Sequence, residues 1–214
     1  MNAWIGLKAV YDKEMLTYFR SPIAYFVIAV FLLGTGYFFT YNIFLTGVGT
    51  MDQTLQNMGI LLITLSPVLT MRLFSAEYNG RTMELLMTAA SCINLIPLYL
   101  YGNPQTLNIV AGYIGFILLG MACIGIGQFF SALTENQIVA ALITIPTLLG
   151  FWFVGHLQSL QSSLLLRDLF SHLSFALHYA DFIHGLLRSE AITYFLVVAA
   201  IALTLNNSYL QCRR

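Results

Sequence analysis

Long apolar runs, separated by short polar or charged segments, dominate the pattern of residues along the chain. Most of these runs are close to or above the ~20 helical residues that cross a bilayer. They predict spanning helices at 23–45, 54–72, 106–133, 138–155 and 191–207. We therefore expect an all-α, polytopic membrane protein.

A further apolar piece, 92–101, is too short for a span, because ten residues at ~1.5 Å each cover about half of a ~30 Å hydrocarbon core. The turn Gly102-Asn103-Pro104 follows it directly. We expect six transmembrane helices in the full chain, and we hypothesise that residues are missing near Ser91/Cys92. The alternative is a genuine deletion, which would invert the second half. An intact mass of 23.9 kDa for the natural chain would contradict the hypothesis.

Two segments between or before the spans are amphipathic. In 1–20, apolar and charged residues can occupy opposite sides of a helix, which predicts a helix lying in the membrane interface; the alternative is a frayed tail. In 73–91, Glu77, Arg81 and Glu84 are spaced by four and three residues and form one polar ridge on a helix. Such a helix needs a surface to lie against, either headgroups or another protein.

Composition agrees with a membrane protein and limits its partners. The 214 residues are 58% hydrophobic and 8% charged, compared with roughly 25% charged in an ordinary soluble domain. The formal net charge is zero, so no nucleic-acid partner is predicted. The three cysteines have no paired spacing and are predicted to be packing residues.

The positive-inside rule orients the first half of the chain only. With six crossings both termini are cytoplasmic, and seven of the nine basic residues lie inside. If 92–101 does not cross, the second half flips, yet the count is again seven against two.

The sequence gives little support for a catalytic site or a metal site. The chain has no P-loop pattern, and its only lysines are Lys8 and Lys13. His178, Asp181 and His184 step by three residues, so on a helix they diverge instead of converging on a metal. An intramembrane enzyme lacks a candidate catalytic group, and we predict no enzymatic activity for this chain.

Four blocks in order along the chain resemble the ABC-2 type transporter permeases, most closely those of the gliding-motility and nitrous-oxide-reductase-maturation type. The likeness covers nearly the whole sequence. The blocks are Lys13-Glu14 to Tyr25, Arg72-Leu73-Phe74-Ser75-Ala76-Glu77 to Leu86, Leu119-Gly120 to Ala141, and Leu173-Ser174 to Gly185.

The resemblance implies a role for each segment. Residues 1–20 would be the elbow helix, and 73–91 would carry a coupling helix that docks on a separate ATPase subunit. Residues 156–190 would form an extracytoplasmic helical segment. The implied ATPase contacts are Glu77, Arg81, Glu84, Leu85 and Leu86; Glu135 and Asn136 form the second cytoplasmic turn; His178, Asp181 and Phe182 lie in the extracytoplasmic segment.

By the same resemblance, the chain is a permease subunit in the inner (plasma) membrane that couples ATP hydrolysis to export or movement of a substrate. The implied partners are two ATPase subunits, which would bind ATP and Mg²⁺, a second permease copy or related subunit, and membrane lipid. It also allows an extracytoplasmic accessory protein. The alternative is a non-transporting scaffold or force-transmitting subunit of an ATPase-driven assembly.

Overall fold

The computed structural model describes residues 22–46, 51–73, 88, 106–134, 136–157 and 164–212. Regular structure in these residues is entirely helical. The elements are α2 (Pro22–Thr46), α3 (Met51–Leu73), α6 (Thr106–Leu133), α7 (Gln137–Leu157), α8 (Leu164–Leu173), α9 (Phe175–Ile183) and α10 (Ser189–Cys212).

The prediction of an all-α membrane protein is confirmed. Four helices are long and apolar enough to cross a membrane, over Tyr25–Phe44, Asn108–Leu133, Ile138–Leu157 and Ser189–Tyr209. The fifth predicted span, 54–72, is the helix α3, which is the most polar of the five long helices and is not among these four. The predicted elbow helix 1–20, the coupling-helix region 73–91 and the piece 92–101 lie outside the described residues, apart from Leu73 and Thr88.

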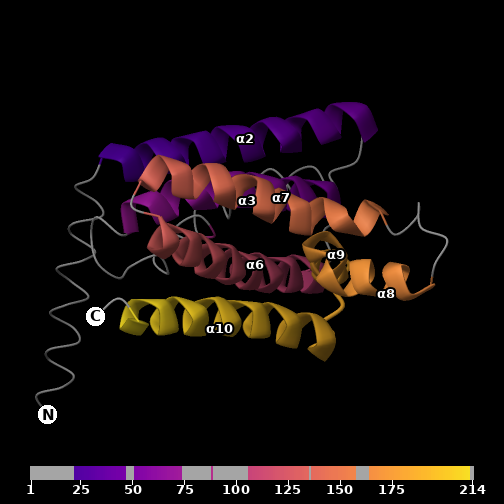
Figure 1. Cartoon of the computed structure of the whole chain (residues 1–214). Helices are drawn as coiled ribbons and strands as arrows, with labels where there is room; N and C mark the ends of the chain where they lie inside the picture. The colour runs from indigo at the N-terminus through magenta and orange to yellow at the C-terminus, as the bar shows by residue number, and fades with distance from the viewer. Residues whose placement is uncertain are drawn as a thin grey trace, which may run out of the picture.

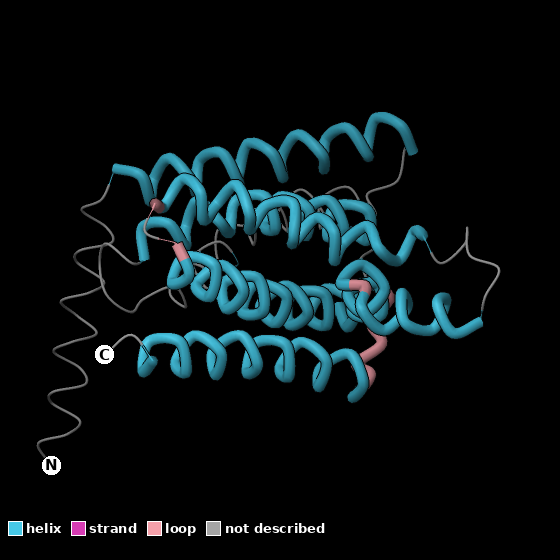
Figure 2. Tube along the Cα trace, in the orientation of Figure 1, coloured by secondary structure: helices cyan, strands magenta, loops and turns pink. Residues whose placement is uncertain are grey.

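The long helices lie side by side, with α2 and α10 on opposite sides of the bundle and α3, α6 and α7 between them (Figure 1). The short helices α8 and α9 lie together at one end, which we call the α9 end; the other is the far end. Short loops lie at these two ends (Figure 2). Residues of α9 pack on four long helices, α3, α6, α7 and α10.

The helices α3 and α6 run parallel, in register. A Cβ added to Gly112 would collide with Leu55, and one added to Gly127 would lie 2.7 Å from the Thr70 side chain. Both pairs of positions are 15 residues apart along their own helices, which is ~22 Å of helix. Glycine at both points of α6 lets the two backbones approach closely, as the small residues of membrane helices commonly do.

This parallel arrangement separates the end of α3 from the start of α6. The chain leaves α3 at Leu73 at the far end and enters α6 at Thr106 at the α9 end (Figure 1). The start of α2 and the end of α10 both lie at the far end as well. The 32 residues 74–105 therefore connect opposite ends of the bundle.

Hydroxyl side chains maintain α3 around its proline. Pro67 has no N–H to donate to the carbonyl oxygen of Ile63, and the Ser66 hydroxyl donates to that oxygen instead, at 3.0 Å. The Thr70 hydroxyl donates to the Pro67 carbonyl oxygen at 3.0 Å. Because these bonds satisfy backbone groups away from water, α3 continues as one helix through Pro67.

The core combines residues from all five long helices and α9, and aromatic side chains are its largest members. Those with almost no exposed surface are Phe31, Phe116, Phe175, Tyr179, Phe182 and Phe195. Two glycines of α6 lie against neighbouring helices: Gly115 faces Phe182 of α9, and Gly127 faces Thr70 of α3.

We expect Gly115→Ala to destabilise the protein, because the new Cβ would lie 2.6 Å from the Cβ of Phe182, which cannot move without shifting α9. Overpacking of this kind costs about 1–3 kcal/mol. The control is Gly150→Ala on α7, where nothing lies within 4 Å of the added Cβ. Thermal unfolding in detergent should show a lower Tm for the first variant only; equal Tm values would contradict this packing.

Candidate functional site

The candidate site is the short helix α9 with its flanking residues. Its ends are set locally by two signals. The Ser174 hydroxyl accepts a hydrogen bond from the backbone N–H of Leu177, at 3.3 Å, and caps the start of the helix. At the other end Gly185 adopts φ 74°, a left-handed conformation that glycine accepts without strain, and its N–H donates to the Phe182 carbonyl oxygen.

Tyr179 ties α9 to the first turns of α3. Its side chain is fully buried, and its hydroxyl donates to the carbonyl oxygen of Leu55 at 3.1 Å. Burial, with a smaller Coulombic effect of Tyr113, raises the pKa of the Tyr179 hydroxyl above its ordinary value, so the group stays a donor. The ring lies 6.0 Å from that of Trp152 on α7.

Phe182 and Phe175 fix the apolar side of α9. Phe182, a predicted site residue, is fully buried against Gly115 of α6 and lies 6.3 Å from the ring of Phe195 on α10. Phe175 stacks on Phe151 of α7 at 5.2 Å. The role of Phe182 in the structure is therefore to pack α9 into the bundle.

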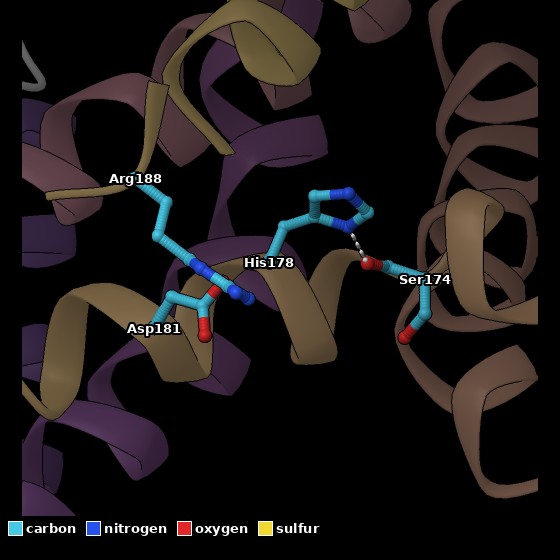
Figure 3. Close-up of polar contacts among 4 residues, drawn as sticks. All are labelled: Ser174, His178, Asp181 and Arg188. Carbon is cyan, nitrogen blue, oxygen red and sulfur yellow. Dashed lines mark hydrogen bonds and ion pairs between the residues drawn. The ribbon is translucent and has the colours of Figure 1, made fainter. Parts of the chain in front are cut away.

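His178 joins α9 to α10. Its ring stacks on Tyr194, with centroids 4.0 Å apart and planes at 12°. Its Nδ1 lies 2.9 Å from the Ser174 carbonyl oxygen (Figure 3). The Tyr194 hydroxyl donates to the Leu173 carbonyl oxygen at 2.8 Å. Together these contacts join the α8–α9 corner to α10.

Asp181 forms the only ion pair among the described residues. Its Oδ2 lies 3.7 Å from Nη1 of Arg188, and Figure 3 shows the arginine lying over the carboxylate. The two side chains are 29% and 60% exposed. A pair this accessible to water contributes about 0–1 kcal/mol, so it supplements the buried contacts and does not replace them.

These contacts have a structural role, which is to hold α9 against its neighbouring helices. Ser174, His178 and Asp181 lie within one short segment, but the serine hydroxyl caps the helix, the imidazole bonds to a carbonyl oxygen and the carboxylate pairs with Arg188. No three His, Cys, Asp or Glu side chains among the described residues are grouped to hold a metal ion. The site can hold α9 against four other helices.

Asn136, the one described residue of the predicted second cytoplasmic turn, lies at the far end, just before α7 (Figure 1). Its Oδ1 accepts from the Ile138 N–H at 3.0 Å, so it caps α7. Its neighbour Glu135 lies outside the described residues. So do the five predicted ATPase contacts: Glu77, Arg81, Glu84, Leu85 and Leu86.

The fold defines the chain as an α-helical membrane protein with at least four helices capable of spanning a bilayer. No protein-family model matches the chain, and no curated protein or solved structure is significantly similar to it. The resemblance to ABC-2 type permeases therefore stays a prediction.

Sequence reasoning singled out three residues of α9 but missed the contacts that hold it. Ser174 directly precedes an apolar run, and a serine in this position is a recognisable signal for the start of a helix. The partners of Tyr179 and Tyr194 are 124 and 21 residues away in sequence, and no local pattern pairs them.

We expect Tyr179→Phe to lower the free energy of unfolding by about 1 kcal/mol, because it removes one buried hydrogen bond and leaves the ring packing intact. Tyr37→Phe on the exposed side of α2 is the matched control and should change stability by less than about 0.5 kcal/mol. Denaturant titration in mild detergent measures both. Equal stabilities of the two variants would show that the Tyr179–Leu55 bond does not hold α9.

Proposed function

We propose that this chain is the membrane-spanning subunit of an ABC-2 type transporter, moved by a separate ATPase subunit to export or displace a substrate. The proposal rests on the resemblance of four sequence blocks and on the direction of the helices. It places the far end of the bundle in the cytoplasm and the α9 end outside.

The observation that carries the proposal is the parallel packing of α3 and α6. Because α3 and α6 are parallel, the two segments that would contact an ATPase both follow helix ends at the far end. One is the end of α3 at Leu73, after which the predicted coupling helix follows, and the other is the turn at Asn136. Two contact points on the same side of the membrane are what docking on one partner requires.

The same packing supports six crossings. Since 74–105 connects opposite ends of the bundle, a return across the membrane within it makes α3 the second span and α6 the fourth. In sequence, Arg20 lies two residues before the start of α2 and Arg213 directly follows the end of α10, and both of these helix ends lie at the far end with Arg72. Arg167 and Arg188 lie at the α9 end. This distribution supports a cytoplasmic far end by the positive-inside rule.

A second function is favoured by the way α9 is held. Its contacts with α3, α6 and α10 would carry a displacement of α3 to the outer surface as rigid-body motion. A force-transmitting subunit that drives an outer partner would use this path without moving a substrate. Retained ATPase coupling without substrate flux would distinguish it from a transporter.

The test is native purification of the chain from its own membrane, followed by mass spectrometry of the proteins that accompany it. We expect an ATPase subunit in about equal amount. Replacing Glu77, Arg81 and Glu84 together by Ala should release it, because these side chains form the polar ridge of the predicted coupling helix.

The control replaces Arg167, Asp168 and Glu190 by Ala, which removes the same charges at the α9 end. This variant should keep the ATPase. A chain that purifies alone, or an ATPase that is released equally by both triple variants, would refute the proposal.

A further inference from the structure

The helix α8 has one apolar side that stays about half exposed in the described part of the protein. Around the helix, Leu166, Leu169 and Leu173 lie within one narrow arc, while Arg167, Asp168 and Ser171 lie across from it. The three leucines are 42%, 55% and 40% exposed. Phe170, next to the stripe, and Ser171, on the opposite side, are half-buried, so α8 contacts the bundle chiefly through residues outside the leucine stripe.

The position of α8 argues for lipid as the occupant. The helix packs on α7, a candidate span whose last turns also expose the apolar Phe153 and Leu157. Figure 1 shows α8 beside the end of α7, running back toward α9 from beyond that end of the bundle. The leucine stripe therefore adjoins the surface of a helix that is itself expected to face acyl chains.

The net charge on the polar side of α8 indicates whether anionic headgroups or apolar burial would hold the helix at the lipid surface. Arg167 and Asp168 are adjacent on the polar side and cancel, and Ser171 is neutral. An amphipathic helix with no net charge on its polar side gains its affinity from buried apolar area, not from anionic headgroups.

We propose that α8 lies on the lipid surface at the α9 end, with Leu166, Leu169 and Leu173 inserted at the boundary between headgroups and acyl chains. Only Ser174 separates α8 from α9. The lipid contact of α8 therefore also holds the start of α9 at the membrane surface. This inference depends on the membrane character of the chain and not on an ATPase partner, so it stands or fails separately from the proposed function.

Tryptophan quenching in nanodiscs tests it, with the full chain in phosphatidylcholine and a phospholipid brominated near the top of its acyl chain. Emission of the unmodified protein, which contains Trp4 and Trp152, is subtracted. In Leu169→Trp, the added emission should fall at least about twofold with brominated lipid, as a side chain at the acyl boundary requires. Leu166→Trp is an independent second variant on the same stripe and should behave alike.

Asp168→Trp, across the helix from Leu166, is the control. Its emission should change little with brominated lipid and should instead be quenched by acrylamide from the water. The proposal is overturned if the tryptophans at 166 and 169 are quenched by acrylamide and not by brominated lipid. It is also overturned if they are protected from both, which would assign the stripe to protein such as a second copy, or if their quenching requires anionic lipid.

Discussion

The close approach of α3 to α6 is the contact on which the other features depend. Gly112 and Gly127 let the two helices pack in parallel over ~22 Å, because the side chains of Leu55 and Thr70 occupy the space that a Cβ on either glycine would need. Parallel neighbours in a membrane need a connection that returns across it. This single packing choice therefore determines which helix ends share a side, and the order of the remaining helices follows from their short connections.

The helix α9 completes the bundle at one end. It contacts α3 through the hydroxyl of Tyr179, α6 through Phe182 and α10 through the ring of His178. Its own nine residues are too few to form a stable helix alone, so these tertiary contacts maintain it. Because one short element touches most of the bundle, a movement of any neighbour must either carry α9 along or break one of these contacts.

The hydrophobic pattern predicts much of the fold because lipid leaves the backbone few options. The expected spans at 106–133 and 138–155 agree with α6 and α7 to within two residues. The last expected span, 191–207, lies within α10, which continues through Asn206 and Asn207 to Cys212. Polar residues near the end of a membrane helix do not stop it, since the helix can continue in the interface.

The arrangement of the spans was less predictable. Counting basic residues left the direction of the second half open, because seven against two resulted either way. The contacts of Gly112 and Gly127 with Leu55 and Thr70 show that α6 runs parallel to α3, and no local pattern reveals the partner of either glycine. Likewise, Asp181 and His178 stood out as ionisable residues, whereas the buried tyrosine that fastens α9 resembles any other aromatic residue of an apolar helix.

The central claim, that the start of α3 and the turn before α7 lie on opposite sides of the membrane, is tested most directly by labelling with a membrane-impermeant maleimide in sealed cells. Gln53→Cys and Leu186→Cys place exposed thiols at the α9 end, and Asn136→Cys places one at the far end. Labelling of the parent protein at its own cysteines is subtracted. With the orientation proposed above, the first two variants are expected to react from outside, and Asn136→Cys only after the membrane is opened. Reaction of Gln53→Cys and Asn136→Cys from the same side would contradict the parallel packing of α3 and α6.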